Sequence, residues 1–445
     1  MKIGNSAPSQ VGLDSLLDFR PEVVIDGQSL SKSELEQLMQ GAEGLQLIRG
    51  SWVEVDQERI REALNHWKKV RASHPDGLEL VQGMRLLAGA TISSEEQSLG
   101  GASEWTRFEA GSWLRETLQR MRSADGVLGC QPGRDLQATL RPYQVRGVQW
   151  LWFMTELGLG ACLADDMGLG KTIQFIAFLL NLYQQKELKF PYLLICPTSV
   201  LTNWEREVKR FAPDLKCGVH HGEKRSKGKS FKSFALEYHL VITSYSLVHR
   251  DLADFKTVSW QGVVLDEAQN IKNAEAKQSI SVRELATTPR KDQPLPFRIA
   301  LTGTPVENRL TELWSIMEFL NPGYLGTKAF FQRRFMMPIE RYGDRDSLQA
   351  LRSLVQPFIL RRLKTDRSII QDLPEKQEMI LFCEMEDEQR RIYDAYRNDF
   401  RNQILGTIET QGIQKSQLTI LQGLMKLRQI CDSPAILNEQ EKFEH

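Results

Sequence analysis

The stretch between residues 161 and 180 constrains the fold of this chain more than any other. The apolar run Ala161–Ala164 leads into a loop that ends in Gly170-Lys171-Thr172, and a very apolar helical pattern follows. A strand, a glycine loop, a Lys-Thr pair and a helix in this order predict a P-loop. Gly168 and Gly170 would let backbone N–H groups close around phosphate oxygens, and the helix N-terminus adds partial positive charge.

Each residue of this loop has an expected task. Lys171 would reach the β- and γ-phosphates of a nucleotide, and the Thr172 hydroxyl would bind magnesium. The remaining residues of the predicted phosphate cradle are Asp166, Met167, Gly168, Leu169 and Gly170. The strict P-loop pattern has glycine where this chain has Asp165, so a glycine-containing turn without a ligand remains an alternative.

A pair of acidic residues follows another apolar run. Asp266 and Glu267 come directly after Val263–Leu265, and ligands bind at the carboxyl ends of strands in open α/β sheets. Asp266 would hold magnesium, and Glu267 would orient and deprotonate an attacking water. Such a pair often caps a helix instead, but its combination with the P-loop favours phosphoryl chemistry. We expect Lys171 and the pair to converge across the tips of neighbouring strands.

Beyond residue 140, short apolar runs alternate with helix-like runs. These runs are Ala161–Ala164, Tyr192–Cys196, Leu240–Thr243, Val263–Leu265 and Ile299–Leu301. The pattern predicts an α/β fold with a mainly parallel sheet covered by helices on both sides. The net charge is +0, which excludes a uniformly basic coat for nucleic acid. No run of 18 apolar residues exists, so no membrane span is expected.

These motifs together resemble the Swi/Snf-type family of helicase-like ATPases. Asp165 through Thr172 resembles the family's own P-loop, which tolerates Asp at the first glycine position, and Asp266-Glu267-Ala268-Gln269 resembles its DExx box. Leu140–Gln144 is similar to the adenine-reading segment, with Gln144 as the base contact. The resemblance implies a RecA-like P-loop lobe, ATP and magnesium as cofactors, and a DNA-dependent ATP hydrolase.

The resemblance also implies coupling and nucleic-acid contacts. The segment Leu301–Asn308 resembles the part that couples phosphate state to lobe motion, which assigns Thr302, Gly303 and Thr304 to coupling. The expected nucleic-acid contacts are Thr198, Asn203, Trp204, Thr243, Ser244 and Tyr245. From the residues alone, hydroxyl groups after strand ends can either grip phosphates or cap helices.

The chain is expected to have three parts. Residues 1–133 read as an α+β accessory N-terminal domain in which Ser31 and Glu34 form a capping box. Residues 136–325 form the RecA-like ATP-binding lobe 1, and residues 326–445 form a largely helical protrusion with an incomplete start of lobe 2. The six cysteines contain no CxxC pattern, so neither a zinc module nor a disulfide framework is expected, and a cytoplasmic location follows.

The implied function is an ATP-dependent translocase or remodeller on double-stranded DNA, nucleoid-associated if bacterial. A DNA-bound protein is a further expected partner, and RNA is a weaker candidate than DNA. The family's Gln-x-x-x-Arg-x-x-Arg helix does not occur before His445, so we expect a fragment or truncated product. The alternative is a nucleotide-gated nucleic-acid-binding module with little hydrolysis. A small-molecule P-loop kinase is disfavoured, because Glu267 directly after Asp266 suits water activation.

Overall fold

The structure is a computed structural model of the 445-residue chain. It describes residues 2–8, 12, 15–20, 24–25, 28–40, 44–48, 51–58, 60–61, 65, 77–87, 109–123, 135–287, 296–303, 309–366, 379–411, 413–433 and 436. These residues fall into two compact units, Met1–Gln371 and Asp372–His445. The predicted division into three parts therefore stays a prediction.

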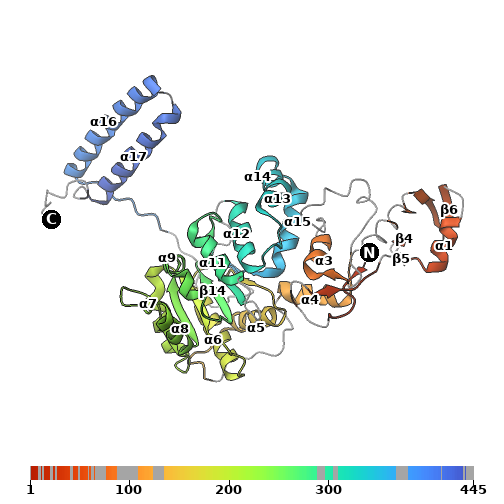
Figure 1. The fold of residues 1–445 in the computed structure, drawn as a ribbon. Helices are drawn as coiled ribbons and strands as arrows, with labels where there is room; N and C mark the ends of the chain where they lie inside the picture. The colour runs from red at the N-terminus through yellow and green to blue at the C-terminus, as the bar shows by residue number, and fades with distance from the viewer. Residues whose placement is uncertain are drawn as a thin grey trace. The chain divides into compact units, whose positions relative to one another are not determined.

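A seven-stranded sheet forms the centre of the first unit (Figure 1). Its strands are β10 (Ala161–Leu163), β11 (Tyr192–Cys196), β12 (Cys217–Val219), β13 (Leu240–Ser244), β14 (Gly262–Asp266), β15 (Phe297–Leu301) and β16 (Ile359–Leu360). The order is β12-β13-β11-β14-β15-β10-β16, and every neighbouring pair is parallel. The predicted α/β class and all five predicted strands are confirmed. The short strands β12 and β16 were not predicted.

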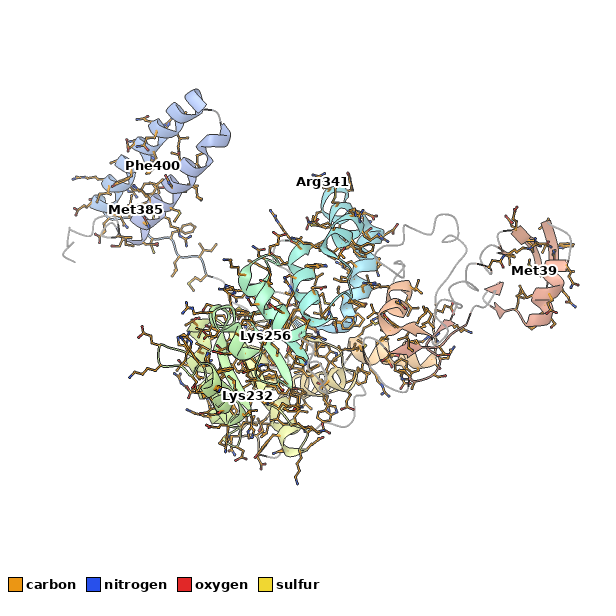
Figure 2. All side chains as sticks on the ribbon, viewed as in Figure 1. Met39, Lys232, Lys256, Arg341, Met385 and Phe400 are labelled. Carbon is orange, nitrogen blue, oxygen red and sulfur yellow. The ribbon has the colours of Figure 1, made fainter. Side chains whose placement is uncertain are left out.

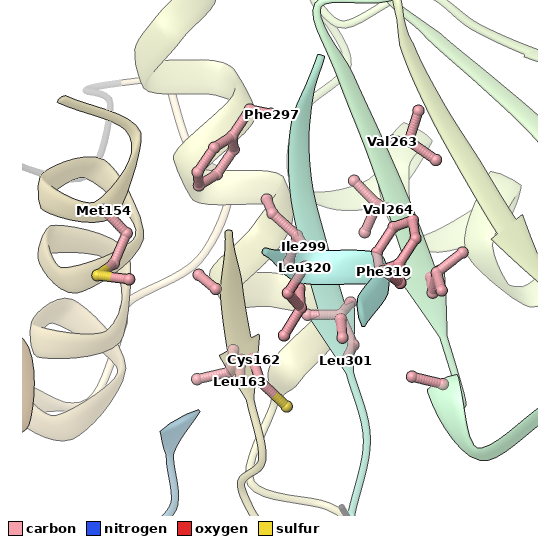
Figure 3. Packing of buried hydrophobic residues seen from close by; sticks show 14 of the residues in the cluster. Met154, Cys162, Leu163, Val263, Val264, Phe297, Ile299, Leu301, Phe319 and Leu320 are labelled. Atoms are coloured by element: carbon pink, nitrogen blue, oxygen red, sulfur yellow. The ribbon is translucent and has the colours of Figure 1, made fainter. Parts of the chain in front are cut away.

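Helices cover the sheet and bury its side chains. They are α5 (Pro142–Glu156), α6 (Lys171–Gln184), α7 (Leu201–Phe211), α8 (Lys229–Leu236), α9 (Tyr245–Arg250), α10 (Leu252–Phe255), α11 (Lys277–Thr287), α12 (Leu310–Leu320) and the 3-10 turns Thr198–Val200 and Ala268–Ile271. Figure 3 shows Leu163, Ile299 and Val264 from three adjacent strands packing near Phe319 and Leu320 of α12. Strands buried on both faces explain the continuous apolar runs of the sequence.

Between α12 and β16 the chain is helical. The elements are α13 (Lys328–Phe331), a π-helical segment (Gln332–Met336), α14 (Met337–Tyr342), α15 (Arg345–Val355) and a 3-10 turn (Gln356–Phe358). The chain then returns to the sheet, where β16 pairs with β10. A segment more than 190 residues downstream of the P-loop strand thus lies directly beside it.

The N-terminal region is α+β, as predicted. Its elements are β1 (Lys2–Ile3), β2 (Leu16–Leu17), β3 (Phe19–Arg20), β4 (Val24–Ile25), β5 (Gln28–Ser29), α1 (Lys32–Gln40), β6 (Gly44–Ile48), β7 (Ser51–Val55), β8 (Leu78–Glu79), α3 (Leu80–Leu87), β9 (Glu109–Ala110) and α4 (Ser112–Ser123). The capping box is confirmed, because the Ser31 N–H donates to Glu34 Oε2 at 2.8 Å and the Glu34 N–H donates to Ser31 Oγ at 3.3 Å. The Trp150 indole N–H donates to the Met121 carbonyl at 2.8 Å, which ties α4 to α5.

The second unit is a helical hairpin of α16 (Asp387–Gln411) and α17 (Ile413–Asp432). Phe400, labelled in Figure 2, is buried, and a Cβ placed on Gly423 would lie 3.0 Å from its ring. The Lys426 ammonium lies 5.7 Å from the centroid of the same ring, a cation–π distance. Among the described residues of the whole chain, none of the helices has the length and apolarity that a bilayer crossing requires.

Candidate active site

The turn from β10 to α6 has the geometry of a phosphate cradle. Gly168 and Gly170 have φ values of 83° and 82°, which side chains with a Cβ rarely adopt. Gly170 is the N-cap of α6, and Lys171 is its first residue. The Lys171 ammonium donates a 2.7 Å hydrogen bond to the Asp165 carbonyl. The predicted strand, loop and helix are therefore all present.

The acidic pair lies at the end of β14, where the backbone is strained. Glu267 has a φ of 49°, in the left-handed region that non-glycine residues seldom occupy and that often marks functional sites. Asp266 Oδ1 accepts the Glu267 N–H at 3.0 Å, and Asp266 Oδ2 accepts the Trp204 indole N–H at 2.7 Å. Burial raises the pKa of Asp266, and the hydrogen bond from Trp204 opposes that rise.

Both halves of the site act on the same lysine. Burial lowers the pKa of Lys171, and the negative charges of Glu267, Asp165, Asp266 and Asp166 counteract it. The P-loop and the acidic pair are thus electrostatic neighbours at one edge of the sheet, as predicted. The expectation of adjacent strands was wrong, because β15 lies between β10 and β14. One strand, β15, therefore separates the two groups along the edge of the sheet.

Thr302 follows β15 in that intervening position. Its buried hydroxyl donates to Gln269 Oε1 at 2.9 Å, and the Gln269 amide donates to Glu267 Oε2 at 2.7 Å. Gly303 lies against the P-loop, because a Cβ there would be 3.0 Å from Met167 Cγ. The structure thus links the predicted coupling segment to both halves of the site. Thr304 lies outside the described residues.

Gln144 lies beside the P-loop and is almost buried. Its Oε1 accepts the Arg141 N–H at 2.9 Å, which closes a capping box on α5, and its Nε2 donates to the Leu169 carbonyl at 3.1 Å. A Cβ on Gly170 would come within 2.5 Å of that Nε2. Residue 170 is therefore glycine for two reasons: a side chain would collide with Gln144, and the backbone has a positive φ.

The six predicted nucleic-acid contacts divide into two groups. Thr198, in the 3-10 turn before α7, and Asn203, in the first turn of α7, are exposed. In contrast, Trp204, Thr243, Ser244 and Tyr245 are 2%, 0%, 1% and 4% exposed, so their side chains offer almost no surface to a ligand. Tyr245 instead donates to the Asp266 carbonyl at 2.7 Å. In this structure Trp204 and Tyr245 therefore hold Asp266 in place through hydrogen bonds to its carboxylate and its carbonyl.

The sequence contains a pattern that predicts a buried position for Trp204. Leu201, Trp204 and Val208 follow one another at helical spacing and are all buried, the pattern of a core-facing helix stripe. Its hydrogen bond to Asp266 spans 62 residues, and no local pattern signals that contact.

Among the described residues, no group of three or more His, Cys, Asp and Glu side chains could hold a metal ion. Magnesium is usually bound through one or two carboxylates together with substrate phosphates and water. The candidate protein ligands are the Thr172 hydroxyl at the start of α6 and the Asp266 carboxylate at the end of β14. Their chemistry, a hydroxyl and a carboxylate oxygen, suits a hard cation.

Comparison with known families supports this geometry. A model described as the SNF2-related domain matches residues 143–436. The chain belongs to the SNF2-related family. The match includes Gln144, the P-loop and the acidic pair, and it extends into the helical hairpin. A second model, described as SNF2 Helicase protein, matches residues 1–88 of the N-terminal region.

Similar proteins come from bacteria, archaea and eukaryotes. YwqA of Bacillus subtilis (strain 168), named as a candidate ATP-dependent helicase/translocase, is 39% identical over 98% of this chain and 46% of its own length. The TATA-binding protein-associated factor MOT1 of Saccharomyces cerevisiae is 35% identical over 73% of this chain and 18% of its own length. The Sulfolobus solfataricus SWI2/SNF2 ATPase core in complex with dsDNA is 44% identical, with a TM-score of 0.50, over 70% of this chain and 62% of that one. The chain thus spans about half or less of the curated relatives.

Proposed function

We propose that this chain is the nucleotide-binding part of an ATP-driven translocase that moves on double-stranded DNA. The observation that carries the proposal is the shared sheet edge: β10 leads into the P-loop and Lys171, β14 ends at Asp266, and only β15 lies between these two strands. Phosphoryl transfer requires mainly positioning and charge neutralisation. A lysine and two carboxylates at one strand edge provide both.

Each side chain has a distinct chemical task in this proposal. The Lys171 ammonium leaves the Asp165 carbonyl and binds the β- and γ-phosphates. Glu267 accepts a proton from the attacking water, and Gln269 holds the Glu267 carboxylate in place. Thr172 and Asp266 would hold magnesium, which would neutralise charge on the phosphate oxygens.

Nucleic-acid binding in this proposal rests on Thr198 and Asn203. Thr198 lies in the 3-10 turn that follows β11, Asn203 lies in the first turn of α7, and both are exposed. A hydroxyl and an amide at these positions can donate to phosphate oxygens. Contacts to the phosphate backbone read no base sequence, so binding should be independent of sequence. The dsDNA in the complex of the Sulfolobus core supports duplex DNA as the ligand.

The direct test is ATP hydrolysis by the protein with and without nucleic acid. We expect duplex DNA to stimulate hydrolysis more than RNA of equal length does, and Lys171→Ala to abolish the stimulated rate. An Asn203→Ala, Thr198→Ala double variant should weaken stimulation while leaving ATP binding unchanged. Absence of stimulation by any nucleic acid would contradict translocation. ATP-dependent DNA affinity without turnover would instead favour the nucleotide-gated binding module.

A further inference from the structure

Asp165 is the residue that departs from the strict P-loop pattern, and its environment explains the departure. Its carboxylate is fully buried. Oδ1 accepts the Arg362 Nε–H at 2.7 Å, and Oδ2 accepts the Gln174 amide at 3.0 Å as well as the Arg362 Nη2–H. A buried carboxylate needs such partners, because removal from water strongly disfavours an unpaired charge. Glycine at this position could not make any of these contacts.

Arg362 joins three elements around the P-loop. Its side chain is 6% exposed. Besides the ion pair with Asp165, Nη1 donates to the Tyr143 carbonyl of α5, and Nη2 donates to Gln174 Oε1 of α6 at 2.7 Å. The guanidinium carbon lies 5.2 Å from the centroid of the Tyr143 ring. The planar fork of arginine suits this number of fixed acceptors better than a lysine would.

The backbone of the same segment runs alongside the P-loop. The Ala164 N–H donates to the Leu360 carbonyl at 2.7 Å, and the Asp166 N–H donates to the Arg362 carbonyl at 3.0 Å. The Lys364 N–H donates to Asp166 Oδ2 at 2.9 Å. A Cβ on Gly147 would come within 1.9 Å of Gln174 Oε1, so glycine in α5 leaves room for the cluster. Residues 360–364 therefore line the P-loop and are hydrogen-bonded to it.

The carbonyl of Asp165 receives the Lys171 ammonium, so the position of Asp165 sets the resting position of the lysine. We propose that Arg362 is a positioning residue of the nucleotide site, which clamps the Asp165 carboxylate and thereby aligns the P-loop and Lys171 for a triphosphate. This inference rests on the proposed function, because alignment of Lys171 matters only if the loop binds a nucleotide. It assigns a role in ATP binding to a segment almost 200 residues downstream.

The test compares Arg362→Gln with the double variant Arg362→Gln, Asp165→Asn in the full chain. Removing one partner of a buried ion pair is strongly destabilising because it leaves an uncompensated buried charge, whereas removing both charges leaves none. We expect Arg362→Gln to lower Tm and to weaken ATP·Mg binding about tenfold, the effect of losing charge-assisted hydrogen bonds. The double variant should regain most of the Tm but keep the about tenfold weaker binding.

A control is the ion pair of Arg225 and Asp251, which lie in the loops before α8 and before α10. Their side chains are 7% and 6% exposed, and Arg225 Nε lies 2.6 Å from Asp251 Oδ2. Arg225→Gln should lower Tm without changing the ATP dissociation constant. The inference is overturned if Arg362→Gln binds ATP as the wild type does, or if the double variant recovers affinity together with Tm. Absence of ATP binding by the wild type would instead contradict the proposed function itself.

Discussion

The two halves of the candidate site hold their charged groups in different ways. On the P-loop side, the Asp165 carboxylate is neutralised by the guanidinium of Arg362 inside the protein. On the acidic side, Asp266 and Glu267 are held by the neutral donors of Trp204 and Gln269. Neutral donors orient a carboxylate without cancelling its charge, whereas an arginine does both. The acidic half therefore keeps its negative charge available for a cation and for a proton.

The largest effect is expected from Glu267→Gln, which removes the proposed base but keeps its shape. We expect the turnover number to fall by roughly 10²–10⁴, the usual contribution of a general base, while ATP still binds, because the P-loop half is intact. Steady-state hydrolysis and ATP titration measure the two quantities separately. Glu275→Gln is the control, since Glu275 forms a surface ion pair with Lys328. If Glu267→Gln lowered ATP affinity as much as the turnover number, the proposal that the P-loop binds ATP and the acidic pair catalyses hydrolysis would be contradicted.

A smaller effect is expected from Trp204→Phe, which removes the indole N–H and keeps a ring against Phe175, whose centroid is 6.0 Å away. Burial already raises the pKa of Asp266 and Trp204 opposes it, so the variant should raise that pKa further. Asp266 must be ionised to hold magnesium. The acid limb of the turnover profile should therefore move to higher pH, with a loss of up to about tenfold near that limb.

The control for this variant is Trp260→Phe. Trp260 is also buried, and its indole N–H donates to the Phe255 carbonyl at 2.9 Å, away from the acidic pair. Its substitution should lower stability without moving the acid limb. A pH profile of Trp204→Phe that coincides with the wild-type profile would show that the indole does not tune Asp266.

The smallest effect is expected from Thr302→Val, which removes the hydroxyl that donates to Gln269. A neutral hydrogen bond contributes about 1 kcal/mol, so we expect a several-fold loss of DNA-stimulated hydrolysis and little change in the unstimulated rate. The control is Thr287→Val, because the Thr287 hydroxyl donates to the Arg283 carbonyl of its own helix at 2.9 Å. Equal loss of both rates would place Thr302 in the chemistry instead of in coupling.

The sequence predicted those parts of the fold whose signal is local. β11 and β14 are continuous apolar runs, and Gly168 and Gly170 define the P-loop turn. β12 and β16 span three and two residues. A run that short carries too few residues for any periodicity. The three-residue β10 was predicted because the P-loop motif follows it, whereas β12 and β16 become strands through pairing with longer ones.

The sequence also placed Lys171, Asp266 and Glu267 at one edge, because motif order and strand ends are local. It could not place Arg362, which meets Asp165 across 197 positions of the chain. Nor did it separate the exposed Asn203 from the buried Trp204 beside it, although the helical stripe through Trp204 carried that information. Long-range ion pairs depend on how elements pack, and one sequence does not encode that packing in any local pattern.

The central claim is that ATP occupies the edge where the P-loop and the acidic pair meet. Amide hydrogen exchange of the full chain with and without ATP·Mg tests it most directly, because bound phosphate oxygens protect the N–H groups that contact them. We predict slower exchange at residues 166–172 and 266–267 and unchanged exchange in the hairpin of α16 and α17. Exchange at 166–172 that stays the same under saturating ATP·Mg would contradict the account.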